Sequence, residues 1–189
     1  SGGATLTVFN LELTGNNGLR KEQANAIVLG VSNSWTGDTD INRGTLRAGH
    51  VNAIPSGPGR GNVNLQVVSG NPNLDLGSVS PIINGLNSTS SVALVNASGG
   101  AGTSILTVGA GDANGEYGGV IADGATRTVG LTKTGAGTQI LTNINTYTGP
   151  TAVNGGVLKL NGDGSIASSS RISLSGGGTL DVTGITTLT

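Results

Sequence analysis

The chain has 189 residues, a formal net charge of −1 and no cysteine, which excludes a disulfide framework and a cysteine-ligated zinc site. The near-neutral charge offers no basic surface for nucleic acid, and no apolar run approaches the roughly 20 residues that span a membrane. We therefore expect no nucleic-acid partner and no membrane insertion by this segment. The 35 glycines and 35% apolar residues predict an ordered protein with a thin core, because disordered chains usually combine low hydrophobicity with high net charge.

Short runs in which apolar and polar residues alternate predict β-strands along the whole chain. The first run, residues 4–14, loses its alternation at Phe9 and Asn10, which indicates two short strands or a bulge. Residues 19–27 contain helix formers, but the repeat described below predicts a strand region there. Further runs cover residues 63–67, 92–94, 106–108, 127–131, 158–160, 172–174, 179–183 and 185–189. Gly- and Asn-rich segments separate these runs and supply the turns.

An internal repeat relates two parts of the chain. Residues 19–47 align without a gap to residues 131–159, at an offset of 112, and 11 of these 29 positions are identical. Trp35 lies opposite Tyr147, an aromatic for an aromatic. A long-period repeat built of short strands is typical of a solenoid or a repeat array.

The repeat also predicts roles for its shared positions. We expect corners after the aromatic residue and at the second glycine, inward β-branched and Leu side chains, and Asn side chains that bond to turn backbone. The corner glycines are Gly37, Gly149, Gly44 and Gly156; the inward residues are Ile41, Val153, Leu46 and Leu158; the Asn residues are Asn42 and Asn154.

The stretch LTKTGAGTQILTNINTYTGPTAVNGGVLKL, residues 131–160, resembles the autotransporter-associated β-strand repeat, also called the passenger-associated transport repeat. The matching positions are Gly135, Gly137, Leu141, Tyr147, Gly149, Thr151, Val153, Gly156 and Leu158. The N-terminal copy departs from the pattern, with Glu22, Gln23 and Asn25 in place of Thr134, Gly135 and Gly137. The resemblance implies a right-handed parallel β-helix in a secreted passenger region, and it implies neither a catalytic activity nor a ligand site.

We therefore expect residues 1–189 to form one all-β segment, a parallel β-helix of about eight turns and a length of roughly 40 Å. The alternative fold is an antiparallel β-sandwich, in which the repeat would mark two domains. Both ends of the chain are strand-like and lack an evident cap, so we expect a piece cut from a longer solenoid or a subunit that stacks on copies of itself. The candidate self-assembly residues are Leu6, Val8, Phe9, Leu11, Ile185 and Leu188.

Weak calcium candidates lie in two Gly-rich turns, where oxygen-bearing side chains are spaced two residues apart. They are Asp112, Asn114 and Glu116 in the first turn, and Asp163 between Asn161 and Ser165 in the second. Neither has the full loop signature, so ordinary Asx turns are favoured and no cofactor is expected. Asn87 and Asn96 begin N-x-Ser/Thr patterns, which arise by chance in so polar a chain.

A catalytic site finds little support. His50 lies in a Gly- and Pro-rich segment without a nucleophile motif, so we interpret it as an exposed loop residue. Asp38 and Asp40 could share a face and serve a carbohydrate-active enzyme, but Pro150 and Ala152 replace them in the second copy. Trp35 and Tyr147 could stack on sugars, although their repeated placement favours packing at a corner.

Three functions follow in order of preference. The first is a non-enzymatic structural protein, a self-assembling subunit or segment of an extracellular bacterial surface fibre. The second is a secreted passenger adhesin that binds a host or matrix ligand such as a glycan. The third is an enzyme that acts on carbohydrate through the same fold.

Overall fold

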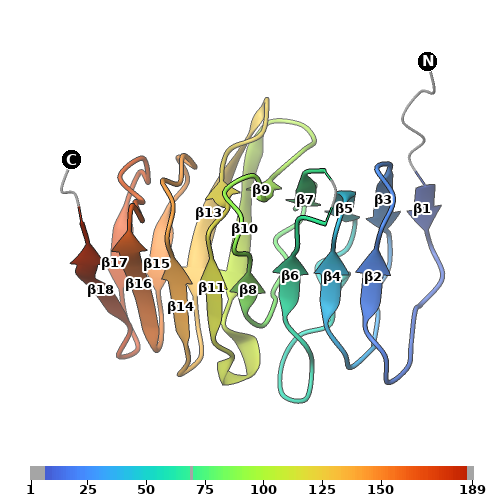
Figure 1. The fold of residues 1–189 in the computed structure, drawn as a ribbon, viewed down its shortest axis with the longest axis horizontal. Coiled ribbons are helices and arrows are strands. Elements are labelled where there is room, and N and C mark those ends of the chain that lie inside the picture. The colour runs from blue at the N-terminus through green and yellow to red at the C-terminus, as the bar shows by residue number, and fades with distance from the viewer. Residues whose placement is uncertain (1–6, 69, 187–189) are drawn as a thin grey trace.

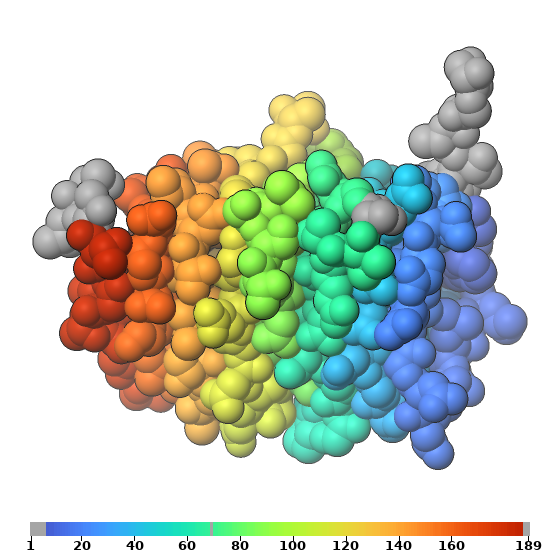
Figure 2. Space-filling view, in the orientation of Figure 1, coloured from blue at the N-terminus to red at the C-terminus, as the bar shows by residue number. Residues whose placement is uncertain are grey.

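The computed structural model describes residues 7–68 and 70–186, and this part of the chain forms a parallel β-solenoid of about eight turns. Each turn crosses three faces in the same order, and the first strand, β1 (Thr7–Phe9), and the last, β18 (Thr179–Ile185), lie at opposite ends of the elongated body (Figures 1 and 2). Every strand pairing is parallel, which confirms the predicted solenoid and excludes the antiparallel sandwich.

The first face is a six-stranded sheet in the N-terminal two thirds of the chain. Its strands are β1 (Thr7–Phe9), β3 (Ala26–Leu29), β5 (Gly44–Ala48), β7 (Pro72–Asp75), β9 (Leu94–Asn96) and β12 (Val120–Ile121). The second face is irregular at first and then becomes a four-stranded sheet. Its strands are β10 (Gly102–Val108), β13 (Arg127–Lys133), β15 (Thr151–Val153) and β17 (Ile172–Leu174).

The third face runs the length of the molecule (Figure 1). Its first half is β2 (Leu19–Lys21), β4 (Thr39–Ile41), β6 (Val63–Leu65) and β8 (Leu86–Asn87). Its second half is β11 (Gly115–Tyr117), β14 (Thr138–Leu141), β16 (Val157–Gly162) and β18 (Thr179–Ile185). A parallel bridge between Ser88 and Tyr117 joins the halves, and one 3-10 turn, η1 (Ala110–Asp112), precedes β11.

The core is a set of inward columns in which each turn adds one side chain. Leu46, Leu74, Val95 and Ile121 pair in register on successive strands of the first face, and each is fully buried. Turns of a parallel sheet stack about 4.8 Å apart, so aliphatic side chains of similar size fill the space between neighbours. The alternation in the sequence produces these columns.

Some predicted alternations have the wrong register. Val92 and Leu94 were expected to point inward, but Ala93 and Val95 are buried there and Val92 is exposed. The expected inward Val67 is also exposed, because β6 ends at Leu65. In contrast, residues 19–27 form β2 and the start of β3, as the repeat predicted.

The two copies of the repeat lie on different faces. Their strands correspond one to one, with β2, β3, β4 and β5 of the first copy equivalent to β13, β14, β15 and β16 of the second. However, β2 belongs to the third face and β13 to the second. The second copy is therefore rotated by one face about the solenoid axis, so a residue and its repeat partner are exposed on different sides of the molecule.

Candidate functional site

One outward column on the third face contains a polar or charged side chain on seven of its eight turns. The register of the strands places Arg20 beside Asp40, Asp40 beside Asn64, and Asn64 beside Asn87. The bridge between β8 and β11 continues the column to Glu116, and it then passes through Ile140 and Lys159 to Asp181. These residues, Arg20, Asp40, Asn64, Asn87, Glu116, Ile140, Lys159 and Asp181, are called the polar column below.

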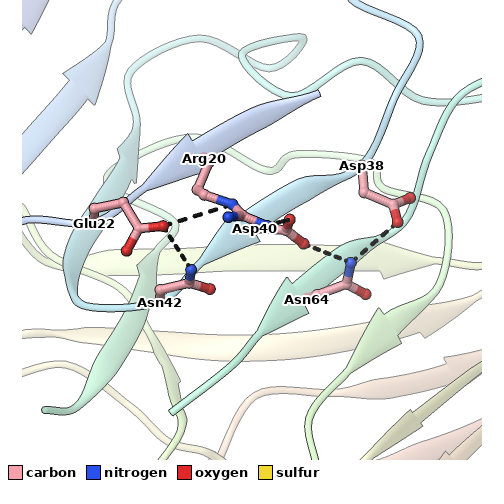
Figure 3. A network of polar contacts seen from close by, with 6 residues as sticks. All are labelled: Arg20, Glu22, Asp38, Asp40, Asn42 and Asn64. Carbon is pink, nitrogen blue, oxygen red and sulfur yellow. Dashed lines mark hydrogen bonds and ion pairs between the residues drawn. The ribbon is translucent and has the colours of Figure 1, made fainter. Parts of the chain in front are cut away.

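The N-terminal half of the polar column is a connected network (Figure 3). The Arg20 guanidinium lies 3.6 Å from a carboxylate oxygen of Asp40 and 3.6 Å from one of Glu22. The Asn64 amide donates to Asp40 at 2.9 Å and to Asp38 at 3.3 Å. Asn87 in turn donates to Asn64 at 2.9 Å. Every contact except that of Arg20 with Glu22 joins consecutive turns, so the network braces the stack.

The same contacts give a structural role to Asp38 and Asp40, the two carboxylates that a glycan-cleaving enzyme would use. Asp38 also accepts the backbone N–H of Asn62 at 2.7 Å, so both of its oxygens have partners on the next turn. Asp40 lies between a guanidinium and an amide. Asp38 and Asp40 are thus brought together as predicted, but as partners of Asn64.

The C-terminal end of the polar column is an ion pair. Lys159 Nζ lies 3.2 Å from a carboxylate oxygen of Asp181. The hydroxyl and backbone N–H of Thr183 donate to this carboxylate at 2.7 and 2.9 Å. These donors, with Lys159, lower the pKa of Asp181 to about 2, so the carboxylate stays ionised and paired with the Lys159 ammonium at mildly acidic pH.

Two buried lysines were not predicted from the sequence. Lys133 Nζ donates to the backbone oxygens of Thr134 at 2.6 Å, Gly135 at 2.9 Å and Gly155 at 3.3 Å. Lys21, its repeat partner, contacts the equivalent oxygens of Gln23 and Arg43. Burial lowers the pKa of both ammonium groups; the Asp112 carboxylate opposes this effect at Lys133. The identity of this Lys in both copies was the signal that could have identified it.

The repeated aromatic residues pack at a corner and do not form an exposed sugar platform. Trp35 and Tyr147 are both buried, and each bonds to the hydroxyl of the Thr four residues later, at 3.2 Å to Thr39 and 2.6 Å to Thr151. Burial raises the pKa of the Tyr147 hydroxyl to about 12, although its bond to Thr151 opposes the shift. The structure therefore confirms the corner interpretation.

The buried Asn at each aromatic corner links three successive turns. Asn33 accepts the backbone N–H of Leu13 at 2.8 Å and donates to the Ala53 oxygen at 2.7 Å. Asn145 makes the equivalent contacts with Ile121 at 2.9 Å and Ser165 at 3.1 Å. By contrast, Asn42 and Asn154 do not bond to turn backbone as predicted, because their side chains instead meet Glu22 and Ser175.

The side-chain oxygens of two calcium candidates, Asp112 and Asn114, accept hydrogen bonds from backbone N–H groups of the protein. Asp112 accepts the backbone N–H of Ala136 at 2.7 Å, and Asn114 accepts that of Thr138 at 2.7 Å. Both contacts therefore join successive turns, whereas the expected Asx turns would be local. Glu116 and Asp163 are exposed on different turns. Within residues 7–68 and 70–186, no group of three or more His, Asp or Glu side chains is arranged to hold a metal ion.

His50, Asn87 and Asn96, which the sequence analysis also considered, have the following positions in the fold. His50 is half-buried, in contrast to the exposed position expected, and its Nδ1 accepts the backbone N–H of Asn52 at 3.1 Å. The Asn87 side-chain amide donates a hydrogen bond to Asn64 Oδ1, as described above. The Asn96 Oδ1 atom, at the end of β9, is buried and has no hydrogen-bond partner.

A shallow groove of about 550 Å³ crosses the third face at β6, β8 and β11. Its polar lining includes Gln66, Thr89 and Glu116, and its apolar wall is formed by Val67 and Val68, of which Val68 is 68% exposed. A mixed lining of this kind suits a ligand with both hydroxyl groups and apolar C–H surface.

Apolar side chains are exposed in the first and last turns. At the N-terminal end, Val8, Phe9 and Leu11 are exposed, Leu11 to 75%. Ile185 of β18 is half-buried against the core. The remaining self-assembly candidates, Leu6 and Leu188, lie outside the described residues.

Comparison with known proteins identifies the repeat. The passenger-associated transport repeat matches residues 19–48 and 131–160, so the chain is a β-solenoid protein that carries two copies of this repeat. The chain is also 35% identical, over 158 residues, to the adhesin BmaC autotransporter of Brucella suis biovar 1 (strain 1330). That alignment covers 82% of this chain and only 4% of the relative. No solved structure matches the chain.

Within the described residues, the structure contains no helix with the length and apolar character of a membrane span.

Proposed function

We propose that this chain is a structural segment of an extracellular bacterial surface fibre, in which the solenoid provides length and stacks end to end with further solenoid. The observation that carries this proposal is the continuous third face, where the strands of eight successive turns pair in one direction from end to end. The repeat type and the similarity to an autotransporter adhesin support a secreted passenger as its setting.

The hydrogen bonds that polar side chains make between turns of the solenoid support the same role. The paired carboxylates, the buried lysines and the corner Asn residues all bond to neighbouring turns. These contacts make the stack resist bending and separation of turns, as a spacer requires. They do not assemble a nucleophile with a general base, so glycan cleavage gains no support from them.

The test is made in cells that display the whole passenger. Antibodies against this segment should label intact cells, and removal of its eight turns should shorten the surface fibre by roughly 40 Å. If the antibodies label only lysed cells, or if removal leaves the length unchanged, the proposed role is wrong.

A second function, ligand binding by an adhesin, is favoured by the groove at β6, β8 and β11 and by the name of the relative. We infer that a glycan would place its apolar face on Val67 and Val68, with hydroxyl groups near Gln66 and Glu116. On a glycan array, the purified chain should give a signal that Glu116→Gln and Val68→Asp both reduce. Asp163→Asn, a surface carboxylate elsewhere, is the matched control and should bind as the wild type does. Failure of every glycan to bind would remove this alternative.

A further inference from the structure

A second groove, of about 440 Å³, lies on the first face and is lined by residues between positions 26 and 126. Its volume is within the range of roughly 300–1,000 Å³ that is usual for small-molecule sites. Its floor consists of side chains that alternate with the inward residues of β5, β7 and β9: Thr45, Arg47, Asn73, Asp75 and Asn96. It is called the first-face groove below, and it shares no lining residue with the groove at β6, β8 and β11.

The wall of the first-face groove is held in place by hydrogen bonds. The segments between β9 and β10 and between β12 and β13 project beyond the neighbouring turns and form this wall (Figure 1). The Thr126 hydroxyl of the second segment donates to the Gly99 oxygen of the first at 2.6 Å. The backbone N–H of Ser98 donates to the Asp75 carboxylate at 2.9 Å and so ties the wall to the floor. A ligand would therefore meet a groove that is already formed, which reduces the entropy cost of binding.

The lining of the groove includes one positive and one negative side chain, and these two are paired. Arg47 Nε donates to Asp75 Oδ2 at 2.6 Å. Asp75 Oδ1 accepts the backbone N–H of Gly77 at 2.8 Å, in addition to that of Ser98. The guanidinium would repel a metal cation, and the carboxylate would repel an anion. The groove therefore suits a ligand that is polar but carries no net charge.

Unpaired hydrogen-bonding groups gather in this groove. Within residues 7–68 and 70–186, three buried side-chain atoms lack a hydrogen-bond partner, and two of them, Asn73 Oδ1 and Asn96 Oδ1, belong to its floor. Buried acceptors without a donor are rare in folded proteins. Rotation of a carboxamide about its Cβ–Cγ bond is easy and exchanges the positions of Oδ1 and Nδ2, so each oxygen can become available to a donor in the groove. Of the Arg47 nitrogens, only Nε donates to a residue that the structure describes.

We propose that the first-face groove binds a neutral saccharide. Each hydroxyl group of a sugar can donate one hydrogen bond and accept others, so adjacent hydroxyls can donate to the two Asn oxygens and accept from the terminal nitrogens of Arg47. The hydroxyls of Thr45 and Thr126 can serve as donor or acceptor beside them. This site is additional to the structural role proposed above and does not depend on it.

A pair of matched variants on the projecting segments tests the site. Ala125 lines the groove and Ala101 does not, and both are exposed. On an array of neutral and acidic glycans, we expect the purified chain to bind neutral glycans. Ala125→Trp should abolish this signal by filling the groove, whereas Ala101→Trp should bind as the wild type does. Val68→Asp, in the groove of the third face, should also leave this signal unchanged.

Two further measurements locate the contact. Asn73→Val, which removes one hydrogen-bonding group, should raise the Kd for the best neutral glycan by roughly two- to tenfold. In nuclear magnetic resonance spectra of the 15N-labelled chain, that glycan should shift the side-chain amide signals of Asn73 and Asn96. Circular dichroism should show that every variant remains folded.

The same experiments can overturn the proposal. If no neutral glycan binds, or if only acidic glycans bind, the ligand class is wrong. If Ala125→Trp and Ala101→Trp bind a neutral glycan equally well, the site is wrong. Each of these results leaves the structural role standing, because that role is tested by the length of the surface fibre.

Discussion

Two lysines occupy inward positions that the alternation of the sequence would assign to apolar side chains. Lys21 and Lys133 are almost fully buried, and each places its ammonium group among backbone oxygens at a corner. A charged group is buried only where such partners offset its lost hydration. These lysines therefore have a fastening role: their hydrogen bonds join a corner of one turn to the corner of the next.

Replacing Lys133 tests this role. Lys133→Met keeps most of the side-chain volume but leaves the oxygens of Thr134, Gly135 and Gly155 without their donor. We expect the free energy of unfolding, measured with urea, to fall by about 1–3 kcal/mol. Lys159→Met, which removes a half-buried partner of Asp181, should cost less than about 1 kcal/mol. Equal losses for the two variants would contradict the fastening role.

The buried tyrosines predict how stability depends on pH. Because burial raises the pKa of Tyr147 to about 12, the unfolded chain loses this proton near pH 10, before the folded chain does. The folded state then binds more protons, so the free energy of unfolding should fall between pH 10 and about 12, by up to about 1.4 kcal/mol per pH unit for each such group.

Burial also raises the pKa of Tyr117, so two groups contribute to this fall. Tyr147→Phe removes one of them, and urea unfolding at a series of pH values should show a shallower decline in that variant. An unchanged slope would mean that the Tyr147 hydroxyl is not buried as described.

At the scale of single elements, the corners depend on glycine for two separable reasons. Gly156 has φ of +57°, and a Cβ atom there would lie 2.3 Å from the Gly137 oxygen on the previous turn. Gly177 has φ of +77°, but a Cβ atom would meet nothing within 4 Å. The first glycine is needed for close approach and backbone conformation, and the second for conformation alone.

Alanine at these two positions should separate the two effects. Gly177→Ala should cost about 1–2 kcal/mol, which is the usual penalty for a left-handed residue. Gly156→Ala should cost clearly more, because the two turns must also move apart. Thermal or urea unfolding that ranks the two variants in the opposite order would contradict the close stacking at this corner.

The sequence predicted where the strands lie along the chain better than it predicted which face of the solenoid each strand occupies. Alternating runs and the repeat located most strands, and the family resemblance indicated a parallel solenoid. The rotation of the second copy by one face could not be predicted, because it depends on unequal turn lengths between the copies, such as the long excursion between β5 and β6. The register of Val92 was predicted wrongly because Val92 lies in the turn before β9, and the buried residue of that strand is Val95.

At the scale of the whole molecule, the polar column could not be predicted from the sequence either. Its members Arg20, Asp40, Asn64, Asn87 and Glu116 are separated by 20 to 29 positions, at intervals that differ from turn to turn. No local motif marks them, and only the strand register brings them together. Asp38 and Asp40 were noticed as a pair, but their partner Asn64 comes from the next turn.

The central claim is that this chain adds length to a surface fibre as one continuous parallel solenoid. Electron cryomicroscopy of the whole passenger, with and without residues 19–186, tests it most directly. We predict a rod whose strands are spaced about 4.8 Å apart along the fibre axis, and a fibre that is roughly 40 Å shorter after the deletion. An unchanged fibre length, or strands that do not stack along the fibre axis, would contradict it.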